Sequence, residues 1–171
     1  MKASAIDEFS SNDLNSELRT TWRLVTDGVM GGKSKGQILH QLICGRNALR
    51  MLGEVSLADD GGFVQVTLDL ADSGKAMDAS MWEGIEIDVL GNSEEYELRL
   101  RTRDLERSWQ SYRQPFFAES NWKSVKLPFD RFERHRTQIY FDARRLHRVG
   151  IIAIGREFSA DVALSGIRFY S

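Results

Sequence analysis

The sequence predicts an all-β fold of the β-sandwich or jelly-roll kind. Apolar and polar residues alternate with a period of two in several short segments, as they do in strands that bury one face. Gly, Asp, Asn and Pro interrupt these segments at short intervals, and only one segment begins like a helix, at Asp142. We therefore expect about eight to ten strands with one or two short helices.

The most pronounced turn follows Trp22. A short β-forming run stops at Asp27-Gly28, two further glycines follow at positions 31 and 32, and an extended polar segment begins at Lys35. Glycine is used where φ is positive or where the backbone approaches another group closely. A tight loop is therefore expected, with Asp27 capping backbone amides. Residues 1–20 are expected to form a peripheral segment that docks as an edge.

The middle of the chain has the clearest strand pattern. The strands predicted from it are 49–57, 63–70, 85–89, 96–102 and 122–127. Asp59-Asp60-Gly61-Gly62 is predicted to form a hairpin-type turn between the first two. The segment 109–117 contains Pro115 and is predicted to be an edge strand, because proline cannot donate to a ladder.

Three features are expected towards the C-terminal end. Asp142 is a candidate N-cap for a short helix over 142–147. The continuous apolar run 149–154 is typical of a central strand covered on both faces. Alternation resumes at Val162 and slips by one residue at Ser165-Gly166, which predicts a β-bulge.

Length and composition limit the classes of protein. With 171 residues, of which 42% are hydrophobic, the chain suits one domain, 1–171, with a core that needs neither disulfide nor metal. Cys44 is the single cysteine, and no apolar stretch has the length of a signal peptide or a membrane span. We expect a cytoplasmic protein without direct membrane insertion. The net charge of −2 favours no nucleic-acid partner, although residues 99–148 carry 13 Lys and Arg against 6 Asp and Glu.

The loop after Trp22 is the first candidate binding site. It is formed by Asp27, Gly28, Met30, Gly31, Gly32 and Ser34. Gly32-Lys33-Ser34 is similar to the end of a phosphate-binding P-loop, but that motif needs a glycine where this chain has Asp27, and no amphipathic helix follows. Two interpretations remain: a structural loop or a binding site. Met30 either packs inward or stands exposed as an adaptable contact.

A second candidate is a face on and after the strand 96–102. It is formed by Arg99, Arg101, Arg103 and Trp109. The simplest interpretation is a solvated sheet face that keeps an edge from aggregating. The alternative is a row of guanidinium groups that pairs with carboxylates of a partner. In that case, reversal of the three arginines to Glu should abolish partner capture and leave stability nearly unchanged.

No motif points to catalysis, a metal or a cofactor. His40, His135 and His147 have no zinc-ligand spacing, and one cysteine cannot form a cysteine cage. Asp59 and Asp60 offer oxygen atoms that suit calcium, but a turn needs Asp and Gly in any case. No Ser, Cys or Lys lies in a recognisable nucleophile motif. A non-enzymatic protein is expected.

These segments together resemble the complex I intermediate-associated family, whose domain is a jelly roll similar to galactose-binding domains. The resemblance is carried by Trp22, 27–32, Ser34, 53, 55–57, 61–63, 82–84, 96–98, Trp122, 127–129, Phe132, 151–155 and Phe158. It implies a non-enzymatic role, since mitochondrial members are chaperones that hold assembly intermediates of respiratory complex I. Lacking a transit peptide and a long extension, this chain resembles a stand-alone bacterial relative.

Two functions of different classes are open at this point. The first is a protein-interaction module that assists the assembly of a multi-subunit complex, with subunits of a respiratory complex as candidate partners. The second is a module that binds carbohydrate or another small ligand, because galactose-binding-like sandwiches often bind sugars at loop ends lined with aromatic and carboxylate side chains. A hydrolase has only fold analogy behind it.

Overall fold

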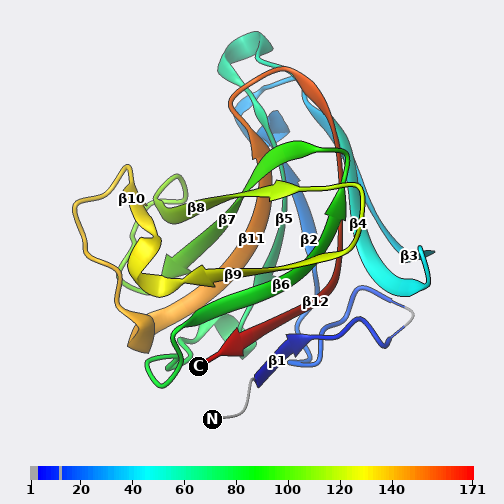
Figure 1. Cartoon of the computed structure of the whole chain (residues 1–171). Coiled ribbons are helices and arrows are strands. Elements are labelled where there is room, and N and C mark those ends of the chain that lie inside the picture. Colours follow the sequence, from blue (N-terminus) through cyan, green and yellow to red (C-terminus); the bar gives the residue numbers. More distant parts are fainter. Residues whose placement is uncertain (1–3, 12) are drawn as a thin grey trace.

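A computed structural model describes residues 4–11 and 13–171 (Figure 1). The strands are β1 Ser4–Asp7, β2 Arg23–Thr26, β3 Lys35–Ile43, β4 Arg46–Val55, β5 Phe63–Asp69, β6 Gly84–Gly91, β7 Glu94–Thr102, β8 Ser111–Ala118, β9 Lys123–Pro128, β10 Glu133–His135, β11 Leu146–Ile154 and β12 Phe158–Tyr170. Helical turns in this part of the chain are all short 3₁₀ turns: η1 Asp27–Met30, η2 Ala58–Asp60, η3 Asp72–Gly74, η4 Phe129–Arg131 and η5 Ala143–Arg145. The predicted all-β class is confirmed.

The strands form two antiparallel sheets that pack against each other (Figure 1). The first sheet has the order β3-β4-β12-β6-β9, with β1 also paired to β12. The second sheet has the order β10-β8-β7-β11-β5-β2. β11 lies between β7 and β5, which confirms the central strand expected from the apolar run 149–154.

The hairpin predicted at Asp59–Gly62 is wrong. β4 belongs to the first sheet and β5 to the second, so η2 carries the chain from one sheet to the other. An Asp-Gly turn signals a change of direction, but both flanking strands have an apolar face to bury. They bury these faces against each other across the core instead of pairing side by side.

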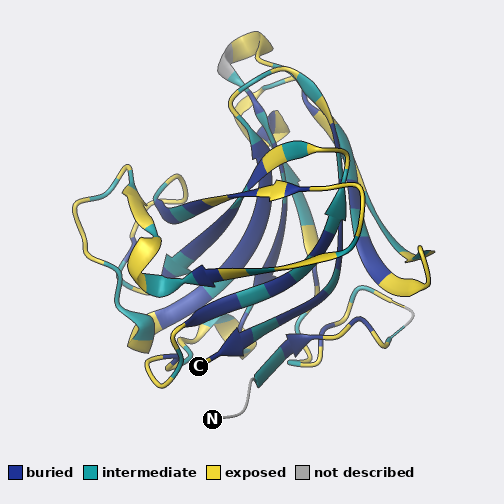
Figure 2. Cartoon of the chain, in the orientation of Figure 1, coloured by how far each residue is buried: buried dark blue, intermediate teal, exposed yellow. Residues whose placement is uncertain are grey.

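The core lies between the two sheets. Figure 2 shows buried residues along the strands of both sheets and exposed residues mainly in the connections. Alternate residues of β6 and β7 point into this core; Ile85, Ile87 and Leu98 are each 0% exposed. The period-two pattern in the sequence is therefore the pattern of inward-facing side chains.

Three local expectations are confirmed, one of them in part. β10 pairs only with residues 111–113 of β8, so Pro115 lies past its end, on an edge of the described sheet. The pairing of β12 with β6 shifts between Leu164 and Gly166, as a bulge requires. Asp142 accepts a hydrogen bond from Arg144 N at 3.0 Å, but the helix that it caps is the single turn η5.

Within the expected edge segment 1–20, the strand β1 pairs with β12, while residues 1–3 and 12 lie outside the described residues. Asp7, at the end of β1, is 2% exposed and accepts hydrogen bonds from Trp22 Nε1 and Phe9 N, both at 2.8 Å. Burial raises the pKa of Asp7 above its ordinary value, although these two hydrogen bonds oppose the rise. The Trp22 ring also stacks on Phe9 at 5.9 Å, so this contact fastens the segment to the core.

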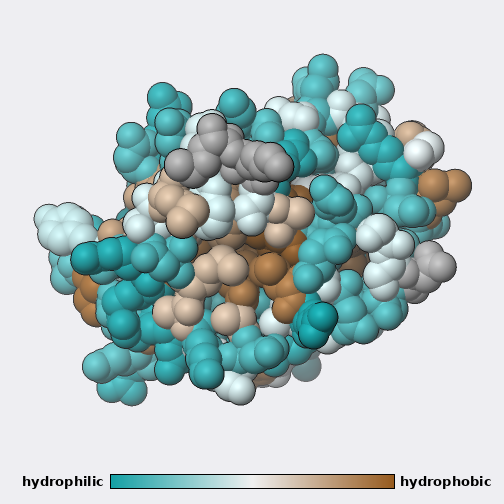
Figure 3. All heavy atoms as spheres, turned by 90° about the horizontal axis from the view of Figure 1, so that it is seen from below, coloured by the Kyte–Doolittle hydropathy of each residue, from teal (hydrophilic) through white to brown (hydrophobic). Residues whose placement is uncertain are grey.

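The end of the sandwich where β1 and the end of β12 lie has an apolar centre. In Figure 3, which looks at this end, hydrophobic residues gather in the middle and hydrophilic residues border them. No helix among the described residues has the length and apolar character needed to cross a membrane.

Trp22→Phe should lower the free energy of unfolding by about 1–3 kcal/mol, because the buried Asp7 carboxylate loses a hydrogen-bond donor while the aromatic packing is kept. Urea unfolding followed by circular dichroism measures the change. Trp109→Phe is the matched control, since Trp109 is 55% exposed and should change stability by less than about 0.5 kcal/mol. Equal stability of the two variants would contradict a structural role for the contact between Asp7 and Trp22.

Candidate functional site

The loop that follows β2 is built around the buried carboxylate of Asp27, which is 0% exposed. Asp27 accepts hydrogen bonds from Ser34 N at 3.0 Å, Ser34 Oγ at 2.5 Å, Gly62 N at 2.5 Å and Phe63 N at 3.3 Å. The Ser34 hydroxyl also accepts a bond from Ser56 N at 2.8 Å. The carboxylate therefore joins the connection between β2 and β3 to the connection between β4 and β5.

The hydrogen bonds to Asp27 outweigh the cost of its burial. Burial alone would raise the pKa of Asp27, but the donors of Ser34, Gly62 and Phe63 together hold this pKa below its ordinary value of 3.8. The group is thus ionised at neutral pH. This confirms the expected capping of backbone amides by Asp27, although the donors come from two connections and not from one.

Glycines make room for this carboxylate. A Cβ atom at Gly32 would lie 2.4 Å from Asp27 Cγ, and one at Gly61 would lie 2.4 Å from Asp27 Oδ2. Gly31 has open space around it but a φ of +84°, in the left-handed region that glycine tolerates. Glycine is therefore required at position 32 by packing and at position 31 by the backbone conformation.

The end of the loop is exposed and apolar. Val29 is 77% exposed and Met30 is 61% exposed, while Leu57, on the connection that Asp27 joins to the loop, is 46% exposed. We call these three side chains the apolar tip. They belong to η1 and to the residue before η2, and these two turns lie at the end of the sandwich opposite to β1, at the top of Figure 1. Met30 therefore stands exposed and does not pack inward.

The arginine row is not a uniform solvated face, which corrects the expectation for β7. Arg99 is only 7% exposed; its guanidinium lies 2.6 Å from Glu97 Oε1, and Nη1 donates to Ser111 Oγ at 3.0 Å. Burial lowers the pKa of Arg99, and Glu97 opposes this. Reversal of Arg99 to Glu would therefore disturb the fold and cannot serve as a test of surface contact.

The other members of this candidate face differ from one another. Arg101 Nη1 donates to the carbonyl oxygens of Arg107, at 2.8 Å, and of Gln110, and so holds the connection that carries Trp109. Arg103 is exposed, and Trp109 is 55% exposed with the Arg107 guanidinium 5.8 Å from its ring centroid. Only Arg103 and Trp109 of the four residues present largely free surface.

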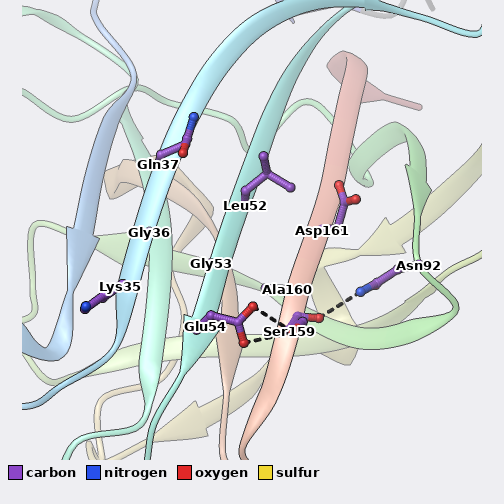
Figure 4. Close-up of a pocket in the computed structure, with 10 residues that line it drawn as sticks. All are labelled: Lys35, Gly36, Gln37, Leu52, Gly53, Glu54, Asn92, Ser159, Ala160 and Asp161. Atoms are coloured by element: carbon purple, nitrogen blue, oxygen red, sulfur yellow. Dashed lines mark hydrogen bonds between the residues drawn. The ribbon is translucent and has the colours of Figure 1, made fainter.

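A shallow groove of about 460 Å³ crosses the outer face of the first sheet (Figure 4). It is lined by Lys35, Gly36, Gln37, Leu52, Gly53, Glu54, Asn92, Ser159, Ala160 and Asp161. The pairing registers place Gln37, Leu52 and Asp161 in one row across β3, β4 and β12. We call this groove the sheet groove.

Four of the polar residues of the sheet groove take part in hydrogen bonds: Glu54, Asn92, Ser159 and Asp161. Ser159 Oγ donates to both oxygens of Glu54, at 2.7 and 2.8 Å, and Asn92 Nδ2 donates to Ser159 O at 2.8 Å. Asp161 receives two bonds from Arg50, at 2.8 and 2.7 Å. Carboxylate, amide and hydroxyl groups fixed in this way suit a ligand with several hydroxyl groups.

Sequence reasoning missed the sheet groove because its residues come from three strands and from the turn after β6. No local motif joins Gln37, Glu54, Asn92 and Asp161, and the only available signal was that Gln37, Glu54 and Asp161 are polar residues on the outer side of strands. Among the described residues, no group of three or more His, Cys, Asp or Glu side chains could hold a metal ion. Asp59 instead lies 3.9 Å from Lys33 Nζ.

Asp27→Asn should lower the free energy of unfolding at neutral pH by about 2–4 kcal/mol, because an amide nitrogen then faces hydrogen-bond donors in a buried site. Since the fold depresses the pKa of Asp27, its contribution is complete above pH 3.8 and is lost as the pH falls through the lower folded value. The difference between wild type and variant should shrink over that range. Thermal unfolding at several pH values measures it, with the exposed Asp59→Asn as control; a neutral effect at pH 7 would contradict the role of Asp27.

Comparison with solved structures finds β-sandwich modules of the jelly-roll kind. The family 11 carbohydrate-binding module of the cellulosomal cellulase Lic26A-Cel5E of Clostridium thermocellum matches with a TM-score of 0.72 at 15% identity, over 100% of this chain and 95% of that chain. A structure of the family 11 module from the same organism, in complex with a β-1,3-1,4-mixed-linked tetrasaccharide, matches with a TM-score of 0.70 at 15% identity, over 99% and 95% of the two chains.

The family 30 module of the cellulosomal cellulase Cel9D-Cel44B of Clostridium thermocellum matches with a TM-score of 0.67 at 15% identity, over 100% of this chain and 98% of that chain. At these identities the likeness concerns the fold, and it confirms the predicted jelly roll. Comparison with curated protein sequences finds no match. The model of the family described as complex I intermediate-associated protein 30 matches residues 8–163. The chain therefore belongs to the complex I intermediate-associated protein 30 family.

Proposed function

We propose that this chain is a non-catalytic, protein-binding assembly factor that holds a subunit of a multi-subunit complex, with a respiratory complex of the complex I type as the first candidate. The observation that carries the proposal is the apolar tip: exposed side chains on a loop that a buried carboxylate fixes in place. Membership of the complex I intermediate-associated family supports the same class of function.

The physical argument rests on exposure and rigidity together. Val29 and Met30 leave apolar surface in water that a partner would cover at a gain of about 1.5–3 kcal/mol for each side chain. The hydrogen bonds to Asp27 order the loop before any partner arrives, so little conformational entropy is lost on binding. Met is also suited to partners of varied shape, as a chaperone requires.

The location that we propose is the cytoplasm. Cys44 is a free, exposed thiol, which suits a reducing compartment. The whole chain acts, in this proposal, as one domain.

Capture from the native host should depend on the apolar tip. Tagged wild-type protein should co-purify with subunits of a membrane-bound respiratory complex, and the double variant Val29→Asp, Met30→Asp should recover at least about tenfold less of them, because two charges replace apolar contacts. Mass spectrometry of the captured proteins measures this. Leu42→Asp is the matched control, because Leu42 is 68% exposed and lies outside the tip. Undiminished capture by the double variant, at an unchanged melting temperature, would contradict the proposal.

The sheet groove supports a second candidate, a carbohydrate-binding module. Its fixed carboxylate and amide groups suit sugar hydroxyls, and the structures with a similar fold include carbohydrate-binding modules, one of them with a tetrasaccharide. The described residues that line this groove include no aromatic ring, so recognition would depend on hydrogen bonds and on the half-buried Leu52.

Calorimetric titration with a β-1,3-1,4-mixed-linked tetrasaccharide separates the two candidates. If the sheet groove binds sugar, Gln37→Ala and Glu54→Gln should each weaken binding by about tenfold, since each removes hydrogen bonds to the ligand. Glu95→Gln, an exposed carboxylate on the second sheet, should leave the affinity unchanged. Absence of heat with the wild-type protein, with calcium present or absent, would eliminate this candidate for this sugar.

A further inference from the structure

A larger hollow of about 960 Å³ opens beside the outer strands of the two sheets. β9 is the last strand of the first sheet and β10 the last strand of the second, and η4 connects them. The hollow is lined by Ser80, Trp82, Glu83, Tyr112, Pro128, Phe129, Asp130, Phe132, Glu133, Arg134, Tyr140, Phe141 and Ala143. We call it the aromatic groove. Figure 1 places η4 and η5 towards the end of the sandwich that Figure 3 shows, away from the apolar tip.

Aromatic rings packed on one another form the floor of this groove. Phe141 lies at the centre, with ring centroids 5.3 Å from Phe129, 6.3 Å from Phe132 and 5.2 Å from Tyr112. The three phenylalanines are half-buried, so part of each ring is anchored in the core and part remains open to a ligand. The floor therefore offers apolar surface that is already ordered.

One wall of the groove is an exposed ring held in a fixed position. Tyr140 is 77% exposed, and the Arg134 guanidinium lies 4.2 Å from its ring centroid. Arg134 Nη1 also donates to Gln138 O at 3.1 Å, and Tyr112 Oη donates to Ile139 O at 2.9 Å. These bonds fix the segment 138–140 from both sides, so the ring is presented before any ligand binds.

The lining of the aromatic groove carries more negative than positive charge. Its exposed carboxylates are Glu83, Asp130 and Glu133, and its one cation among the described residues is Arg134, whose guanidinium already stacks on Tyr140. Glu133 also lies 4.0 Å from Arg113 Nε, in an exposed ion pair that solvent weakens. The neighbouring Tyr170 responds to this field: burial raises the pKa of Tyr170, and Glu83 and Asp130 raise it further. An incoming cation would be attracted, and an anion would be repelled.

We propose that the aromatic groove binds an extended peptide segment of a partner protein, one that carries proline or aliphatic side chains together with at least one Lys or Arg. Aromatic floors accept the flat, apolar surface of such segments, and a pre-extended polyproline-type chain loses little entropy on binding. The carboxylates then pair with the cation of the segment. This inference rests on the proposed protein-binding function and adds to it a second site and the chemical class of its ligand.

The ring geometry favours a peptide over a sugar chain. The plane of Phe132 is inclined by 23° to that of Phe141, but those of Phe129 and Tyr112 are inclined by 38° and 73°, so the floor as a whole does not offer a row of parallel faces. Successive sugar rings would need such faces for stacking, whereas proline and aliphatic side chains fit between inclined rings. Sugar binding in this groove is an outcome that the experiment below can detect.

The probe is a phage-displayed library of random peptides about 12 residues long, which span about 37 Å in a polyproline-type conformation. The library is selected on immobilised wild-type protein, and enriched peptides are synthesised and titrated by fluorescence polarisation. We expect enriched peptides to combine Pro or aliphatic residues with Lys or Arg. Tyr140→Ala should weaken their binding by at least about tenfold, as loss of an exposed aromatic anchor does. The charge-neutral double variant Asp130→Asn, Glu133→Gln should weaken it and reduce its dependence on salt.

The matched control is Trp109→Ala, which removes another exposed ring and should leave peptide affinity unchanged. Failure of the library to yield peptides that distinguish wild type from Tyr140→Ala would overturn the proposal, as would enrichment of acidic peptides. Competition by the mixed-linked tetrasaccharide that depends on Tyr140 would also overturn it in favour of sugar. The double variant Val29→Asp, Met30→Asp is titrated with the same peptides and is expected to bind them with wild-type affinity. Loss of partner capture through the apolar tip and loss of peptide binding in the aromatic groove are then independent results.

Discussion

The buried, ionised carboxylate of Asp27 is the interaction on which one end of this sandwich depends. The chain crosses between the sheets twice there, from β2 to β3 and from β4 to β5, and hydrogen bonds from both crossings converge on this one side chain. A buried charge is tolerated only where donors replace its water. The donors lie in place because Gly32 and Gly61 leave room for the carboxylate, so the charge, the two glycines and the closure of the two connections form one unit.

The strands were largely predictable because burial of one face imposes a period of two, and this pattern is local in the sequence. Sheet membership was not predictable in the same way. The alternation in β4 and β5 is equally compatible with a hairpin and with two strands that face each other across a core, and the turn residues between them fit both. The edge position of Pro115 and the bulge at Gly166 were accessible, because a missing amide proton and a slipped alternation are properties of single positions.

The candidate sites show the same difference between features that are local in the sequence and features that depend on distant residues. The role of Asp27 beside glycines was accessible as local turn chemistry, but its bond to Gly62 spans 35 residues and had no signal in the sequence. The arginines of β7 were placed on the correct face, yet their burial depends on neighbours from other positions, as with Ser111 beside Arg99. The basic stretch is similarly offset by a distant acid where Arg148 lies 2.6 Å from Asp69. Grooves whose lining comes from several strands could not be predicted, because their residues come together only through the order of the strands in the sheets.

The position of the chain ends has a consequence for how the molecule can be attached to other structures. β1 begins, and β12 finishes, at one end of the sandwich, whereas η1, which carries the exposed Val29 and Met30, lies at the other. A tether, a fused neighbour or a solid support joined at Ser171 would therefore leave these side chains pointing away from the attachment. The sandwich would then separate the attachment point from the exposed Val29 and Met30 by its own length.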